Sequence, residues 1–200
     1  SAGLWQRQRR SKLHRRRRPR REHFGELVQL DGSHHDWFEG RRGKAVLMVM
    51  IDDATGKVFA HFCENESWES AATTLRRYTR RQGLPRALYV DRHGIYRADW
   101  APAADEILAG IEPETQFGRA MRELDVELIK ARSPQAKGRV ERVNRTLQDR
   151  LVKELTRAGI SDLEAANRYL EETYLAKFNA LFNKPPAQPS DLHRVLADER

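Results

Sequence analysis

The stretch that decides the fold is SPQAKGRVERVNRTLQDRL, residues 133–151. Its apolar side chains recur at three- and four-residue intervals, which predicts an amphipathic helix after Gly138. The apolar stripe consists of Val140, Val143, Leu147, Leu151 and, one turn further on, Leu155. Glu141 lies beside this stripe, so its carboxylate can stand at the edge of a buried face. Taken alone, the stretch also fits an ordinary solvated helix of mixed charge.

Two more acids follow short apolar runs and favour a functional interpretation. Residues 25–31 (GELVQLD) and residues 87–91 (ALYVD) each end in an aspartate. Both patterns predict strands, which close on Asp31 and Asp91. An acid at the end of a central strand is costly unless it is paired, hydrated or coordinated. Ligands gather where the strands of an α/β sheet end, so we expect Asp31, Asp91 and Glu141 to meet there.

The remaining patterns predict an α/β fold with a five-stranded mixed sheet flanked by helices. Residues 44–51 and 58–63 are apolar enough for buried strands, and with the first strand they make an antiparallel meander. A helix over residues 67–83 follows. An alternation of strand, helix and strand implies a crossover, so the strands at 87–91 and 126–130 are expected to be parallel.

The connections between these elements carry fewer signals. Asp52 and Asp53 lie in a turn between two predicted strands, where aspartate often forms local hydrogen bonds, so we interpret both as structural. Ser161 and Glu164 form a capping box, which predicts the start of a further helix. Residues 92–114 have no firm assignment, although a short helix over 103–109 fits their pattern.

The positive charge is concentrated at the start of the chain. Residues 1–22 contain ten of the 37 Lys and Arg residues and one of the 29 acids, which leaves 27 basic and 28 acidic side chains in the other 178 residues. Such a run is attracted to polyanions through phosphate contacts and counterion release. We therefore predict a basic, flexible DNA-binding arm or linker at 1–22. A solubilising tail is the alternative.

Cysteine content and hydropathy favour a cytoplasmic protein. The single cysteine, Cys63, excludes an internal disulfide framework and a cysteine-based zinc site. No apolar run approaches the roughly 20 residues of a membrane span, and the arginine-rich start lacks the apolar core of a signal peptide. Because the chain begins at Ser1 without a methionine, we expect it to be an excised fragment.

Three carboxylates from three different elements suit metal-dependent chemistry on phosphodiesters. They can hold two hard divalent cations, which prefer oxygen ligands and keep waters that a substrate can replace. Two Mg²⁺ ions about 4 Å apart can activate a nucleophile on one side of a phosphodiester and stabilise the leaving oxygen on the other. This chemistry also needs a basic approach for the nucleic-acid backbone, which the chain offers.

Four pieces of the sequence resemble one family. They are LVQLDGSHHDWF, VMIDDATGKVFAHF, YVDRHGIY and the SPQAKGRVERVNRTLQDRL stretch. Together they resemble the DDE transposase catalytic core of bacterial insertion sequences, a retroviral-integrase-like core with a ribonuclease-H-like fold. The resemblance implies that Asp31, Asp91 and Glu141 are the catalytic acids and hold two Mg²⁺ or Mn²⁺ ions. It also implies that residues 23–184 are the catalytic core and that 185–200 are a C-terminal linker or extension.

By the same resemblance, the chain is expected to hydrolyse DNA at transposon ends and to join the released 3′-hydroxyl to target DNA. The relatives work as synaptic oligomers, so we expect a homo-oligomer on DNA, associated with the nucleoid in a bacterial cytoplasm. Beside the acids and in the arm, basic side chains are expected to contact the DNA backbone. They are Lys137, Arg139, Arg142, Arg145, Arg15, Arg16, Arg17 and Arg18.

Two features depart from the family pattern. The interval between Asp91 and Glu141 holds 49 residues, more than is usual in the integrase group. The extra length falls in residues 95–115, which we interpret as a surface insertion, because lengthening a loop costs little free energy. Arg92 and His93 stand where many relatives have a small polar residue, so the substrate contacts near Asp91 are expected to differ.

Three alternatives stay open at this point. A ribonuclease-H-like nuclease could use the same acids without strand transfer, and a non-catalytic DNA-binding protein could keep the fold. His34, His35 and Asp36 suggest a metal cluster, but neighbouring side chains of an extended segment point to opposite faces. We therefore favour a hairpin or a DNA contact for these three residues.

Overall fold

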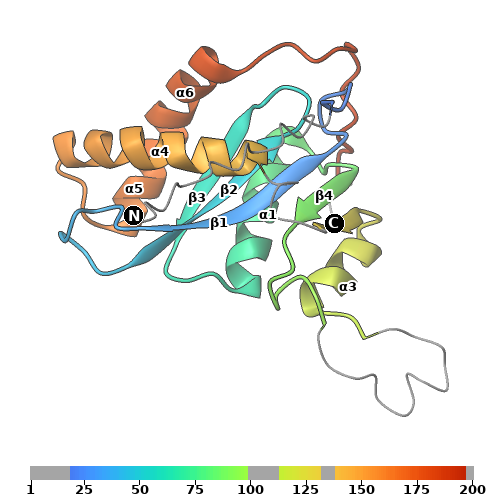
Figure 1. Ribbon diagram of the computed structural model, residues 1–200, viewed down its shortest axis with the longest axis horizontal. Helices are drawn as coiled ribbons and strands as arrows, with labels where there is room; N and C mark the ends of the chain where they lie inside the picture. Colours follow the sequence, from blue (N-terminus) through green and yellow to red (C-terminus); the bar gives the residue numbers. More distant parts are fainter. Residues whose placement is uncertain (1–18, 99–112, 132–137, 197–200) are drawn as a thin grey trace, which may run out of the picture.

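A single mixed sheet organises the protein. The computed structural model describes residues 19–98, 113–131 and 138–196 (Figure 1). In these residues five strands pair in the order β3-β2-β1-β4-β5. The strands are β1 Val28–His35, β2 Ala45–Asp52, β3 Val58–Cys63, β4 Ala87–Val90 and β5 Glu127–Lys130. The first three are antiparallel, and β1, β4 and β5 are parallel, so the predicted five-stranded mixed sheet is confirmed.

Helices surround this sheet and begin and end at residues suited to those positions. They are α1 Trp68–Gln82, α3 Gln116–Glu123, α4 Gly138–Arg157, α5 Leu163–Tyr169, the π-helical turn η2 Leu170–Tyr174 and α6 Leu175–Phe182. The Ser67 hydroxyl caps α1 by accepting from the Ser70 amide, and Gly83 ends it at φ +93°. The helix predicted over residues 67–83 is thus confirmed at both ends. No helix in the described ranges combines the length and apolar character needed to cross a bilayer.

Two details of the predicted elements were wrong. The cap of α5 is Asp162, whose carboxylate accepts from the Ala165 amide at 2.8 Å, and not Ser161. Aspartate is as good a cap as serine, so the pattern alone did not separate two adjacent candidates. The strand predicted to close on Asp31 continues to His35, because β2 stays paired with it along its whole length.

The two faces of the sheet carry different helices. Leu30 pairs with Met50, which pairs with Phe59, and the Phe59 ring contacts Tyr78 of α1 with the ring centroids 5.9 Å apart. Side chains alternate along a strand, so Asp31 faces the other way, where Asn144 of α4 reaches it. Figure 1 shows α4 crossing this second face along the direction of β1. The apolar stripe of α4 is buried there, as predicted.

Side chains from two helices cover the exposed edge of the sheet. The Asn167 amide of α5 bonds to both the N–H and the C=O of Phe62 on β3, at 2.7 and 3.0 Å. Asn179 of α6 makes the same pair of bonds to Val58, at 2.7 and 2.8 Å. These asparagines occupy hydrogen-bonding groups that an edge strand would otherwise present to another chain.

The C-terminal segment returns to the start of the sheet. Leu84 and Arg194 exchange two backbone hydrogen bonds, and the Leu192 amide donates to the Phe24 carbonyl. His193 is buried between them, with its Nε2 atom 2.7 Å from the Tyr78 hydroxyl. The segment up to residue 194 therefore contacts the core, while the division of the chain at 22 and 184 stays a prediction.

Candidate active site

The parallel pairing of β1 with β4 brings two acids together. The register joins Val28 to Leu88 and Gln29 to Tyr89. The same offset, continued by two residues, sets Asp31 beside Asp91, one on β1 and the other just after the last residue of β4. Aligned residues of neighbouring strands point to the same face. Both carboxylates therefore start on the face that α4 covers, and both are half-buried.

Asp31 is held by the facing helix. The Asn144 Nδ2 amide donates to Asp31 Oδ2 at 2.8 Å. Asn144 is itself buried, and its Oδ1 atom has no hydrogen-bond partner among the described residues. A buried carbonyl oxygen normally has a donor, a water or an ion. This oxygen and the Asp31 carboxylate form an oxygen-rich corner suited to a hard cation.

Asp91 lies in the loop that leaves β4. Its Oδ1 atom accepts from the His93 amide at 2.9 Å, which fixes the side chain at the loop entrance. The loop then buries Tyr96, whose hydroxyl has no hydrogen-bond partner in the part of the chain that the structure describes. Burial raises the pKa of Tyr96 well above its usual value, and the negative charges of Glu66, Asp91 and Asp31 raise it further. All three acids therefore lie close enough to Tyr96 for their charge to act on it.

Glu141 occupies the first turn of α4, where a carboxylate interacts favourably with the helix dipole. Further along α4, the Gln148 Nε2 amide donates to the Ser33 hydroxyl on β1 at 3.1 Å. Glu141 lies three residues before Asn144 and seven before Gln148, so all three share one side of the helix. Its side chain is exposed on that side.

The three predicted acids are not closed around one point. In residues 19–98, 113–131 and 138–196, no three His, Cys, Asp or Glu side chains are close enough to hold one ion together. The β1–β4 offset, continued two residues, leads from Asp31 to Asp91, and Glu141 lies on the facing helix α4. In the described part of the chain, His34, His35 and Asp36 do not form a metal cluster either. The His34 Nε2 atom instead lies 2.7 Å from a Glu66 carboxylate oxygen.

Glu66 is an acid beside the site that the sequence did not reveal. Its carboxyl group packs on Gly32, where an added Cβ would lie 2.4 Å from the carboxyl carbon. Gly32 follows Asp31 in β1, so Glu66 approaches from the opposite face of the sheet. Glu66 lies in the loop between β3 and α1, where the sequence pattern indicates only a helix cap at Ser67. Tertiary packing alone brings it here.

The basic side chains near Glu141 divide into two kinds. Arg142 and Arg145 are exposed on α4, as expected for DNA-backbone contacts. Arg139 instead forms an ion pair with Asp53, which is fully buried. The other predicted DNA contacts, Lys137 and Arg15, Arg16, Arg17 and Arg18, lie outside the described residues.

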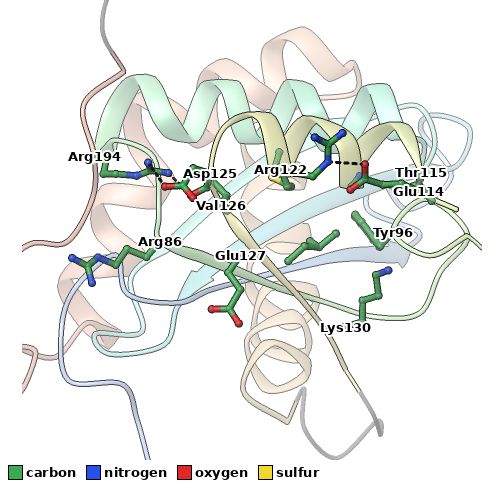
Figure 2. Close-up of a pocket in the computed structure, with 13 residues that line it drawn as sticks. Arg86, Tyr96, Glu114, Thr115, Arg122, Asp125, Val126, Glu127, Lys130 and Arg194 are labelled. Atoms are coloured by element: carbon green, nitrogen blue, oxygen red, sulfur yellow. Dashed lines mark hydrogen bonds and ion pairs between the residues drawn. The ribbon is translucent and has the colours of Figure 1, made fainter. Parts of the chain in front are cut away.

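A separate hollow of about 740 Å³ follows β5 on the far side of β4. Figure 2 shows its charged lining, in which Arg122 pairs with Glu114 at 3.1 Å and Arg194 with Asp125 at 3.0 Å. Neither Asp31 nor the other predicted acids line it. Because much of its charge is matched within its own walls, we do not assign the reaction to this hollow.

Comparison with known proteins tests the family resemblance and the fold. The chain is 44% identical over 196 residues to the y4bF protein of Sinorhizobium fredii, which carries the name of a transposase; the match spans 98% of this chain and 42% of that protein. It is 35% identical over 192 residues to the transposase for insertion sequence IS1202 of Streptococcus pneumoniae, spanning 90% of this chain and 39% of the relative. The chain thus spans about two fifths of the length of these relatives. No family model matches the chain.

Solved structures share the fold at low sequence identity. A chain in the structure of the simian T-cell lymphotropic virus intasome in complex with the PP2A regulatory subunit B56 gamma matches with a TM-score of 0.62 at 18% identity, over 90% of this chain and 60% of that one. The HTLV-2 integrase catalytic core solved with magnesium gives 0.56 at 17%, over 80% and 89%. The BIV integrase catalytic core gives 0.54 at 20%, over 78% and 84%. The resemblance that the motifs indicated is therefore confirmed: the chain is similar in sequence to bacterial transposases and has the ribonuclease-H-like fold of integrase catalytic cores.

Proposed function

We propose that this chain is the catalytic core of a DNA transposase, which cleaves phosphodiesters at transposon ends and transfers the new 3′-hydroxyl to target DNA. The observation that carries the proposal is the β1–β4 register, whose offset, continued two residues past its last pair, leads from Asp31 to Asp91. The hydrogen bond from Asn144 to Asp31 ties the helix that bears Glu141 to this pair. The 44% identity to a protein named as a transposase supports the same function.

The residues present fit a divalent cation. Carboxylates and an amide oxygen are the ligands that Mg²⁺ and Mn²⁺ prefer, and the Asn144 Oδ1 atom has no hydrogen-bond partner among the described residues. Asp31, Asp91 and Glu141 are the residues that would hold two ions. When bound, the ions supply positive charge that activates the attacking oxygen and stabilises the leaving one. A related core, that of HTLV-2 integrase, was solved with magnesium.

The chain's own residues contribute position and charge. Asn144 orients Asp31, and the His93 amide orients Asp91, so both carboxylates are held before substrate arrives. Arg142 and Arg145, exposed on α4, contact the phosphate backbone of the DNA. The basic arm at 1–22 adds binding that does not depend on base sequence, next to a core at 23–184 and an extension at 185–200. The protein assembles as a homo-oligomer that brings two DNA ends together.

Replacing each acid by its amide tests the proposal. Asp31→Asn, Asp91→Asn and Glu141→Gln should each reduce Mn²⁺- or Mg²⁺-dependent nicking of supercoiled plasmid by about a thousandfold or more, with the melting temperature nearly unchanged. Asp149→Asn is the matched control, because Asp149 lies on the same helix and is exposed. A folded Glu141→Gln protein that nicks DNA at the parent rate would disprove the assignment.

A second assay separates strand transfer from hydrolysis alone. Pre-cut duplexes that carry the element's own ends are incubated with a plasmid target, and the joined products are measured. Nicking without joining would favour a ribonuclease-H-like nuclease. If titration shows that neither Mg²⁺ nor Mn²⁺ binds, or that Asp31→Asn does not change binding, the chain would be a non-catalytic DNA-binding protein.

A further inference from the structure

Asp53 is a buried acid that connects distant parts of the chain. It follows β2, and its side chain is 0% exposed. Its Oδ1 atom accepts from the Gln29 Nε2 amide at 2.9 Å, and its Oδ2 atom accepts from the Arg21 backbone amide at 2.8 Å. Its own amide donates to the Leu27 carbonyl at 2.9 Å. Asp53 is therefore fixed to the central strand β1 at both its backbone and its side chain.

The same carboxylate holds the beginning of α4. The Arg139 Nη1 atom forms an ion pair with Asp53 Oδ1, and the Arg139 side chain is only 21% exposed. Arg139 lies in the first turn of α4, two residues before Glu141. A buried carboxylate is stable only when it is paired and hydrogen-bonded, so Asp53 needs partners such as Arg139.

Three contacts attach α4 to the same face of β1. Arg139 reaches Asp53 beside Gln29, Asn144 reaches Asp31, and Gln148 reaches Ser33. The contacts on β1 are two residues apart, and those on α4 are four or five residues apart. Two residues of a strand and four to five residues of a helix span similar lengths, so the two series of contacts stay in step. Glu141 stands between the first contact and the second. Without the first, the turn that carries Glu141 would have a polar contact on one side only, beside the buried Val140, and helix ends fray.

We propose that Asp53 and Arg139 form a positioning pair that sets the place of Glu141 relative to Asp31 and Asp91. The inference rests on the proposed function for its catalytic meaning, whereas the attachment of α4 can be tested without activity. Arg139 thus acts through the helix it anchors, which differs from the phosphate contact that the sequence predicted for it.

Hydrogen–deuterium exchange on the full chain tests the attachment. In Asp53→Asn and Arg139→Gln, amides in the first turns of α4, residues 138–145, should exchange about tenfold faster than in the parent, because local opening becomes easier. Asp52→Asn is the matched control, since Asp52 is equally buried but bonds to Thr55 and Gly25. Its α4 amides should exchange as in the parent, even if its melting temperature falls. Unchanged exchange in Asp53→Asn and Arg139→Gln would overturn the proposal.

The metal requirement tests the catalytic consequence. The Mn²⁺ concentration for half-maximal plasmid nicking should rise about tenfold in Arg139→Gln, because one ligand is no longer held in place. Arg139→Lys keeps the positive charge and should recover part of this loss, and Asp52→Asn should match the parent. An equal metal requirement in Arg139→Gln and the parent would overturn the positioning role. If the parent and every variant fail to nick DNA, the proposed function fails, while the exchange experiment still decides whether the pair anchors α4.

Discussion

Two pairs of aspartates on the same sheet have opposite surroundings. Asp52 and Asp53, after β2, are 1% and 0% exposed and are surrounded by donors from the protein itself. Asp31 on β1 and Asp91, just after β4, are half-buried. The first pair stabilises local structure and the attachment of α4. The second pair consists of the acids that we propose to hold the cations.

The comparison shows that the degree of burial, and not the residue type, distinguishes the two pairs of acids. Burial raises the pKa of Asp52, while hydrogen bonds from Thr55 and Gly25 oppose that shift. An acid in such a place is specialised for folding, because its lone pairs are already used. The negative charges of Asp31 and Asp91 instead help to raise the pKa of the buried Tyr96 hydroxyl. They would also stabilise a positive charge brought by a ligand.

The largest expected effect comes from breaking the buried ion pair. Arg139→Met should lower the free energy of unfolding by about 3–5 kcal/mol, since it removes a charged partner of the buried Asp53 carboxylate. Urea denaturation measures this loss. Arg145→Met is the control, because Arg145 is exposed on the same helix, and it should cost no more than about 0.5 kcal/mol. Equal costs for the two variants would remove the distinction between the two kinds of arginine.

A buried histidine provides the next test, through pH. Burial, reinforced by the positive charge of Arg77, lowers the pKa of His61 to about 4, and its Nδ1 atom has no hydrogen-bond partner among the described residues. The unfolded chain, with a pKa near 6.5, binds more protons between these values, so stability must fall as the pH falls. From pH 7.5 to pH 5 we expect this group to account for a loss of about 2 kcal/mol.

His61→Gln should remove that part of the pH dependence. Urea denaturation of the parent and the variant over the same pH range isolates the contribution of His61 from that of the carboxylates. If the free energy of unfolding changes equally with pH in the two proteins, His61 does not have the lowered pKa that its burial requires.

The smallest effect on stability should come from the candidate catalytic pair. Asp91→Asn keeps an Oδ1 acceptor for the His93 amide and removes one of two aligned negative charges. In the absence of divalent metal, its free energy of unfolding should stay within about 0.5 kcal/mol of the parent's or rise slightly. A loss above about 2 kcal/mol would place Asp91 with the structural acids and contradict the comparison.

Much of the architecture could be predicted from local patterns. β2 and β3 follow apolar runs that two-faced burial requires, and Ser67 and Gly83 mark the ends of α1 as their conformational preferences predict. The end of β1 could not be predicted, because its continuation to His35 depends on pairing with a strand that begins ten residues later. The start of α5 was misplaced by one residue, because Ser161 and Asp162 are both good caps.

The candidate site divides in the same way. Asp31, Asp91 and Glu141 could be selected from sequence because each belongs to an apolar pattern or to a family motif. Glu66 could not, because its position beside Gly32 depends on how the loop before α1 packs on β1. Arg139 looked like one more basic residue in a basic stretch. Its pairing with Asp53, 86 residues away in sequence, is visible only in the folded chain.

The sequence by itself determined the elements and the chemical groups available, since strand and helix periodicity and the positions of the acids are local properties of the chain. Only the tertiary structure decided which acids meet, because that depends on register and packing between elements far apart in sequence. The offset that aligns Asp31 with Asp91 belongs to the β1–β4 pairing. The burial that makes Asp53 an anchor for α4 comes from the layers that close over it.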